Sequence, residues 1–213
     1  MVTPTARPER AEVDGAASLG YAFDMPGSLA PGLLIATPPL NDPNFVRSLI
    51  LMIAHGDEGA LGLVVNSERT VASIGDLLEQ LELTDDGRKH KDPVRLGGPV
   101  QPELGWIVYR PTGDNVREGE IKLSDEIAVT QSREVLASLG RDDGPKPFAA
   151  YLGYTGWAPG QLEEEIRQGS WLPMELDASL VFDTPVERRW QDAYARAGVV
   201  PAGMMGSSRR GVA

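Results

Sequence analysis

Cysteine is absent from the 213-residue chain, which excludes disulfide bonds, thiolate nucleophiles and thiolate metal sites. Histidine is scarce, because only His55 and His90 are present, so a multi-histidine metal site or a serine triad has few residues to draw on. No run of about 18 apolar residues occurs that could cross a bilayer. The N-terminal stretch carries mixed charges and lacks the apolar segment of a secretory signal. We therefore expect a cytoplasmic protein without membrane association.

Positive charge is also in deficit, with 20 basic against 31 acidic side chains and a formal net charge of -11. At neutral pH this mean field repels phosphate polymers. The densest basic cluster, Arg88, Lys89 and Lys91, is flanked by three aspartates, which is typical of a solvated loop. Direct nucleic-acid binding is therefore disfavoured. A protein partner stays an alternative, and the sequence does not identify a small-molecule ligand.

Three short apolar runs form the stretch around which the chain is organised. They are separated by Pro/Asn/Asp and Gly/Asp segments, which predicts three buried strands at 33–36, 49–54 and 61–65. The last two strands are predicted to form a hairpin. Its connection, residues 55–59, is rich in glycine and favours a bulged or extended loop over a two-residue turn.

The rest of the chain mixes helical and strand patterns. A helix is predicted over 73–81, with Ser73 as N-cap and Asp76 closing a capping box. A final helix is predicted to start with Thr184 as N-cap and Pro185 at its first position. Further helices are expected at 132–139 and 161–167, and strands at 105–109, 148–153 and 180–182. The weak alternation of 121–130 predicts a strand pair or a bent strand.

Strands and helices intermingle without strict alternation, which predicts an α+β fold with a mostly antiparallel sheet and about four flanking helices. The length and the 41% hydrophobic content suit a single compact domain. Residues 1–27 are polar and rich in Pro, Gly and Ala, so we expect a mobile N-terminal arm. The domain is predicted to cover residues 28–203, followed by a frayed tail at 204–213.

The combination of these motifs resembles the YqgE/AlgH family of bacterial proteins. The matching residues span about 28–200, and they are Leu34-Ile35-Ala36-Thr37-Pro38, Asp42-Pro43-Asn44-Phe45, Arg47-Ser48, Gly59-Ala60-Leu61-Gly62-Leu63-Val64-Val65-Asn66, Gly97-Gly98-Pro99-Val100, Gly153-Tyr154-Thr155-Gly156-Trp157-Ala158-Pro159-Gly160-Gln161-Leu162-Glu163 and Arg189-Trp190.

The resemblance implies a compact α+β domain with a bent or bifurcated sheet in the bacterial cytoplasm. It implies little about activity, since the family is largely uncharacterised and carries only an association with transcriptional regulation. Two features depart from the family pattern. The N-terminal arm is longer, and Ser67-Glu68 stand where many members have a basic residue and a proline.

The sequence contains few motifs that are typical of catalysis or metal binding. His55, Asp57 and Glu58 could clasp a divalent ion from one loop, although three polar residues in a Gly-rich hairpin are ordinary turn chemistry. Ser48 and His55 could form a serine–histidine pair, but no Gly-x-Ser-x-Gly elbow or Gly-rich phosphate loop occurs. We therefore assign no catalytic residue, no metal site and no cofactor, and favour a non-enzymatic binding or regulatory protein.

The predicted contact surface is the proline-rich loop 38–45, which is preorganised for binding. Its candidate residues are Asn41, Asp42, Asn44 and Phe45. The alternative is a small-molecule pocket or enzyme site beside Gly97, Gly98 and Trp157. A simpler interpretation also stands, in which the prolines end strands and the two aromatic residues fill the core.

Overall fold

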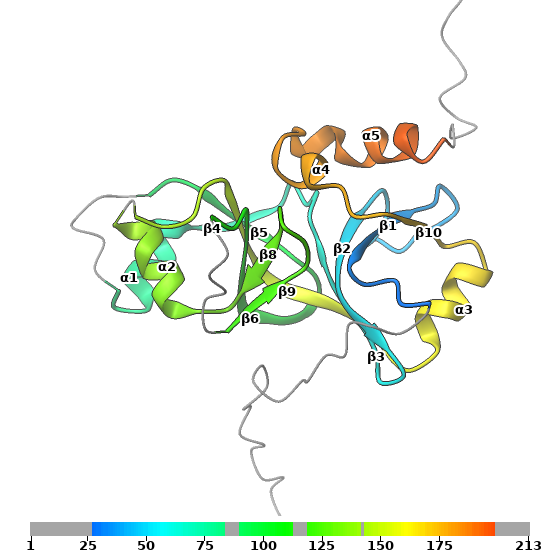
Figure 1. Cartoon of the computed structure of the whole chain (residues 1–213), viewed down its shortest axis with the longest axis horizontal. Coiled ribbons are helices and arrows are strands. Elements are labelled where there is room, and N and C mark those ends of the chain that lie inside the picture. Colours follow the sequence, from blue (N-terminus) through cyan, green and yellow to red (C-terminus); the bar gives the residue numbers. More distant parts are fainter. Residues whose placement is uncertain (1–26, 84–89, 113–118, 142, 199–213) are drawn as a thin grey trace, which may run out of the picture.

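The computed structural model describes residues 27–83, 90–112, 119–141 and 143–198. The expected N-terminal arm, except Gly27, and the expected tail at 204–213 therefore lie outside the described residues, as do Arg88 and Lys89 of the basic cluster. Within the described part, the chain forms ten strands and five α-helices, one helix more than expected (Figure 1).

Three antiparallel strands form the first layer, as predicted: β1 (Gly32–Ala36), β2 (Leu49–Gly56) and β3 (Gly59–Val64). All of β1 and the first six residues of β2 are buried. Both faces of these strands are thus covered, which explains why they read as continuous apolar runs. The hairpin connection differs from the expectation. Gly56 pairs with Gly59 across a two-residue turn, and the irregularity lies inside β2, between Met52 and Ala54.

The strand β9 (Phe148–Trp157) organises the rest of the sheet. One edge of β9 pairs with β6 (Val100–Tyr109). The other edge pairs with the parallel strand β5 (Pro93–Leu96) along 150–152 and with β3 along 155–157. The sheet therefore divides at β9, as a bent or bifurcated sheet requires, and β5–β9 is the one parallel pairing among the described strands.

The remaining strands extend the two branches. The strand order is β10-β1-β2-β3-β9-β6-β8-β7, with β4 joined to β5. The bounds are β4 (Thr70–Ser73), β7 (Glu120–Lys122), β8 (Ala128–Thr130) and β10 (Trp171–Met174). The antiparallel pair β7–β8 shows that, of the two alternatives predicted for 121–130, the strand pair is formed.

Two helices cover the β6–β9 branch on one side (Figure 1): α1 (Ile74–Gln80) and α2 (Arg133–Gly140). The predicted capping box is present, because Ser73 accepts a hydrogen bond from the Asp76 amide, and the Asp76 carboxylate accepts one from the Ser73 amide at 2.8 Å. The helix α3 (Gln161–Arg167) lies beside the β1–β3 branch. None of the helices in the described ranges is long and apolar enough to cross a membrane.

The C-terminal elements differ from the prediction at two points. The apolar triplet 180–182 was expected as a strand but lies in a short helix, α4 (Ala178–Phe182), which Asp177 caps. Three apolar residues alone do not separate strand from helix, and the cap decides between them. The last helix begins as a 3-10 turn (Val186–Arg188) and continues as α5 (Arg189–Arg196). Thr184 does not cap it, because the Thr184 hydroxyl donates to the Ser179 carbonyl instead.

The buried side chains form three cores. The largest lies inside the folded sheet and under α4 and α5, where Trp190 and Tyr194 cover β1 and β2. A second core packs α1 and α2 against β6 and β9. A third core fills the space between the outer face of β1–β2 and α3.

Candidate functional site

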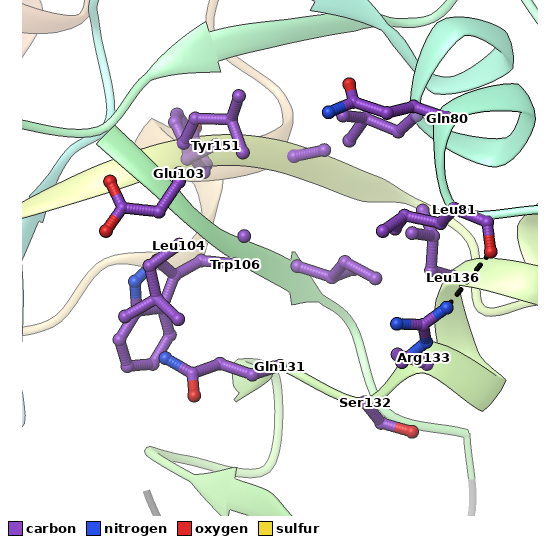
Figure 2. A pocket seen from close by; sticks show the side chains of 15 residues that line it. Gln80, Leu81, Glu103, Leu104, Trp106, Gln131, Ser132, Arg133, Leu136 and Tyr151 are labelled. Atoms are coloured by element: carbon purple, nitrogen blue, oxygen red, sulfur yellow. Dashed lines mark hydrogen bonds between the residues drawn. The ribbon is translucent and has the colours of Figure 1, made fainter. Parts of the chain in front are cut away.

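A hollow of ≈ 420 Å³ lies between α1, α2 and the β6–β9 sheet (Figure 2). Its walls are mainly apolar side chains from helices and strands that are distant in sequence. The leucines on these walls are mostly half buried, so part of their apolar surface stays uncovered. The apolar lining residues are Leu77, Leu81, Leu104, Trp106, Ile107, Leu136, Ala150, Tyr151 and Leu152.

Gly105 lines the hollow where β6 crosses it. A Cβ added at Gly105 would meet only the Leu152 Cδ2 atom, at 3.9 Å. The missing side chain therefore leaves space that any other residue would fill. Glycine weakens a strand and offers no side chain to pack, so its presence here keeps the pocket open at a small cost in stability.

Polar groups surround the apolar walls. Arg133 is exposed, and its Nη2 donates to the Leu81 carbonyl at 3.0 Å, but it has no carboxylate partner within the described residues. The amides of Gln80 and Gln131 form no hydrogen bond to any described residue. Figure 2 places Glu103 on the side of the hollow opposite Arg133. This arrangement suits a ligand with an apolar body and one acidic or hydrogen-bonding end.

The predicted loop residues lie near an aromatic cluster. Phe45 packs edge-on against Trp171 with a centroid distance of 5.8 Å, and Trp171 packs against Trp157 at 5.9 Å. Both indole N–H groups donate to Glu165, at 2.9 Å from Trp157 and 2.7 Å from Trp171. The structure thus joins Phe45 and Trp157 through Trp171, which the sequence reasoning did not include.

The polar residues of the same loop face solvent. Asn41, Asp42 and Asn44 are exposed, and Asp42 accepts a hydrogen bond from the Asn44 amide at 2.8 Å. The neighbouring Val46 is 51% exposed, which is unusual for a large apolar side chain in this fold. A contact role for this loop stays a prediction.

Gly97 and Gly98 occupy a different environment from Trp157. Both are buried, and the Gly97 amide donates to the Leu152 carbonyl at 2.7 Å. A Cβ at Gly98 would lie 2.2 Å from the Tyr154 carbonyl, so the glycine pair permits close approach to the β9 backbone. Neither glycine lines the hollow described above, and a binding role for them stays a prediction.

His55 is occupied by structural hydrogen bonds. Its Nδ1 accepts from the Leu29 amide at 3.1 Å, so Nε2 carries the proton and donates to Glu163 at 2.8 Å. The two arrangements considered from sequence are absent from the described residues. No group of acidic residues and histidines there could hold a metal, and the buried Ser48 hydroxyl has no hydrogen-bond partner.

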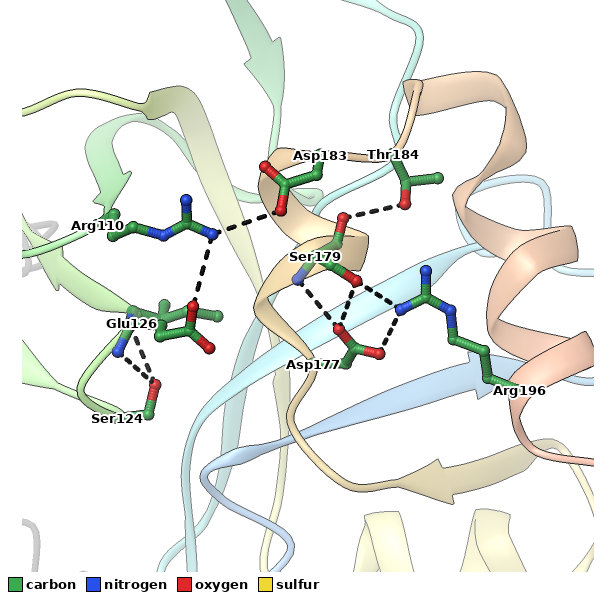
Figure 3. Close-up of polar contacts among 9 residues, drawn as sticks. Arg110, Ser124, Glu126, Asp177, Ser179, Asp183, Thr184 and Arg196 are labelled. Atoms are coloured by element: carbon green, nitrogen blue, oxygen red, sulfur yellow. Dashed lines mark hydrogen bonds and ion pairs between the residues drawn. The ribbon is translucent and has the colours of Figure 1, made fainter.

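A second polar cluster holds the C-terminal helices (Figure 3). Asp177 accepts hydrogen bonds from the Ser179 amide and hydroxyl and pairs with Arg196, which joins α4 to α5. Arg110 lies 3.4 Å from Asp183 and stacks over Phe182 at 5.3 Å, so β6 is tied to α4. The cluster described here contains no imidazole. Its contacts cap α4 and hold it against α5 and β6, so they have a structural role.

Asp177 gives this cluster a pH dependence. Partial burial acts to raise the pKa of Asp177, but the hydrogen bonds from Ser179 and Arg196 outweigh it and lower the pKa. A lowered pKa stabilises the fold above the unfolded value and loses that contribution as pH falls through the folded value. We expect Asp177→Asn to lower the free energy of unfolding at neutral pH by about 1 kcal/mol. The difference from the native chain should shrink below about pH 4.

Urea unfolding of both chains at pH 7 and in acid measures this difference. Glu68→Gln serves as the control, because Glu68 is exposed and forms no hydrogen bond or ion pair with a described residue. An Asp177→Asn deficit that is equally large in acid would show that the carboxylate charge does not hold α4.

Comparison with known proteins identifies close relatives. A family model described as AlgH-like matches residues 33–202. A UPF0301 protein of Anaeromyxobacter dehalogenans is 47% identical over 186 residues, which cover 85% of this chain and 94% of the relative. A UPF0301 protein of Vibrio cholerae is 38% identical over 174 residues, covering 79% and 91%.

Two solved structures are similar along most of the chain. The solution structure of the AlgH protein from Pseudomonas aeruginosa has a TM-score of 0.68 and 31% identity, and the match covers 89% of this chain and 98% of that one. The crystal structure of a Corynebacterium diphtheriae protein has a TM-score of 0.60 and 25% identity, covering 81% and 88%.

Proposed function

This chain belongs to the AlgH-like family, and we propose that it is a non-enzymatic, regulatory binding protein of the cytoplasm. In this proposal the hollow between α1, α2 and β6 takes a small ligand with an apolar body and a carboxylate end. The observation that carries the proposal is the apolar hollow with a polar rim, which Gly105 leaves open.

The size and chemistry of the hollow support binding. Its ≈ 420 Å³ lies within the range of about 300–1,000 Å³ that is usual for ligand pockets. The lining holds one carboxylate, Glu103, and no imidazole, so it offers no acid–base pair for catalysis.

Arg133 favours an acidic end group on the ligand. It is an exposed guanidinium without a carboxylate partner among the described residues, in a chain whose net charge is -11. A ligand carboxylate at Arg133 would form charge-assisted hydrogen bonds with the guanidinium. The same ligand would keep its carboxylate away from the Glu103 charge and point its apolar end toward Leu104 (Figure 2).

Filling the hollow tests the proposal. We expect Gly105→Val to fold with equal or higher stability, because valine suits a strand better than glycine by about 0.5–1 kcal/mol. The variant should lose the thermal stabilisation that octanoate gives the native chain. A ligand at about a hundredfold over its dissociation constant adds roughly 2.7 kcal/mol, which a thermal-shift measurement detects.

Two further variants control the experiment. Gly56→Val is the matched control, because a Cβ at Gly56 meets nothing within 4 Å and Gly56 lies outside the hollow. It should keep the octanoate response. Arg133→Gln should abolish any preference for octanoate over octanol. The proposal fails if octanoate and octanol leave the native chain unchanged, or if Gly105→Val responds as the native chain does.

The loop 38–45 remains a second predicted contact surface, for a protein partner. The exposed Val46, beside the polar residues Asn41, Asp42 and Asn44, is the observation that favours it. The pocket and the loop are separate, because no residue of 38–46 lines the hollow.

A further inference from the structure

Tyr151 lies in a row of hydrogen-bond donors across the sheet. Its strand neighbours in register are Arg95 on β5 and Trp106 on β6, so the three side chains share one face. Tyr151 is 1% exposed and belongs to the core inside the folded sheet. The Arg95 Nε and the Trp106 indole N–H are both buried without an acceptor among the described residues. This face therefore carries more donors than acceptors.

Arg189 reaches the same place from the start of α5. It is 6% exposed, and its Nη1 donates to the Val65 carbonyl at 2.5 Å. The Tyr151 hydroxyl donates to the same carbonyl at 3.3 Å. The Arg189 Nε is held by the Thr184 carbonyl at 3.0 Å. The guanidinium is therefore fixed beside Tyr151 by backbone oxygens.

No described carboxylate neutralises either arginine. Neither Arg95 nor Arg189 forms an ion pair with an aspartate or glutamate of the described ranges, where the ion pairs involve other cations. Burial raises the pKa of the Tyr151 hydroxyl, and the charges of Arg189 and Arg95 oppose that rise, so both cations act at this hydroxyl. Two uncompensated guanidiniums near one point repel each other, and a bound anion would relieve the repulsion.

We propose that the place where Arg95 and Arg189 converge on Tyr151 is a binding site for the phosphate group of a small molecule. The Arg95 Nε and Trp106 Nε1 donors, which have no acceptor among the described residues, and the charges of the two guanidiniums match the acceptor oxygens and the double charge of phosphate. Arg95 is only half buried, which leaves a route from solution. The site adjoins the proposed carboxylate pocket, because Tyr151 lines that pocket, but neither arginine belongs to the pocket lining.

The phosphate can be free or part of an ester, and the two sources share the recognition chemistry. We would therefore measure thermal unfolding with inorganic phosphate, with glycerol 3-phosphate and with sodium chloride at equal ionic strength. Both phosphates should stabilise the native chain more than chloride does. A stronger effect of the ester would identify a phosphorylated metabolite as the ligand, and an equal effect would identify free phosphate.

Matched arginine variants locate the effect. Arg95→Gln should weaken phosphate binding about tenfold or more, because it removes one charged fork. Arg69→Gln is the control, since Arg69 is an exposed arginine close to Arg95 at the β4 end and has no side-chain partner among the described residues. It should bind as the native chain does. Circular dichroism confirms that both variants fold.

Three results would overturn the proposal. The first is an equal effect of phosphate and chloride on the native chain. The second is a response of Arg95→Gln equal to that of the native chain. The third is a loss of affinity in Arg69→Gln as large as that in Arg95→Gln. The last result would show a general charge effect rather than a site.

Discussion

Replacing Trp190 with alanine is expected to lower the free energy of unfolding by about 3–5 kcal/mol, the usual cost of truncating a buried tryptophan. Trp190 is 7% exposed and holds α5 over β1. Its indole N–H donates to the Ala36 carbonyl at 2.8 Å, and its ring packs against Tyr194 at 4.9 Å between centroids. Arg47 covers the ring at 5.6 Å. Alanine would leave a cavity between α5 and the sheet.

Urea unfolding at neutral pH measures this cost. Trp190→Phe is the matched variant, because it keeps an aromatic ring against Tyr194 and loses the hydrogen bond to Ala36. The Ala36 carbonyl retains the Tyr194 hydroxyl at 3.3 Å, so the phenylalanine variant should be clearly more stable than the alanine variant. A Trp190→Ala variant within about 1 kcal/mol of the native chain would show that α5 contributes little to stability.

Most strands and helices of this fold can be predicted from local sequence patterns. The strands β1–β3 are buried on both faces, so their apolar runs leave little ambiguity. The capping box of Ser73 and Asp76 marks the start of α1 because its two hydrogen bonds are both local. Both features depend on residues that are close in sequence. The exception is α4, whose three apolar residues carry no period that separates helix from strand.

Long-range pairing is the part that local patterns do not contain. The division of the sheet at β9 depends on β3 and β5 sharing one edge of that strand. Gly153, with a φ of 72°, lies between the segments of β9 that pair with β5 and with β3, but a glycine in a strand does not tell which strands will pair there. The hollow has the same origin, because Leu77 and Leu136 lie on helices that are distant in sequence and contact each other in the folded chain.

The predicted site residues show the same difference between local patterns and long-range contacts. Phe45 and Trp157 do come together, but through Trp171, which no local motif connects to either of them. Gly105 is predicted from the sequence only as the first residue of a strand. A glycine inside an apolar strand pattern is a known signal for close approach or open space, and it was the available indication of the hollow.

Gly98→Ala is expected to lower the free energy of unfolding by about 3 kcal/mol or more, because a clash with backbone adds to overpacking. A Cβ at Gly98 would lie 2.2 Å from both the carbonyl carbon and the oxygen of Tyr154 and 2.6 Å from the Thr155 nitrogen. These are main-chain atoms of β9, which is paired with β3, β5 and β6. They cannot move away without disturbing the strand at which the sheet divides.

Gly105→Ala separates this steric effect from the general cost of changing a strand glycine. A Cβ at Gly105 has only the Leu152 side chain near it, at 3.9 Å, so this variant should unfold at the same or a higher urea concentration than the native chain. Hydrogen exchange should localise the damage in Gly98→Ala to amides of β9 and its partners. If Gly98→Ala were as stable as Gly105→Ala, the close approach of Gly98 to β9 would be relaxed in solution. The tight contact of the glycine pair would then not determine where the sheet divides.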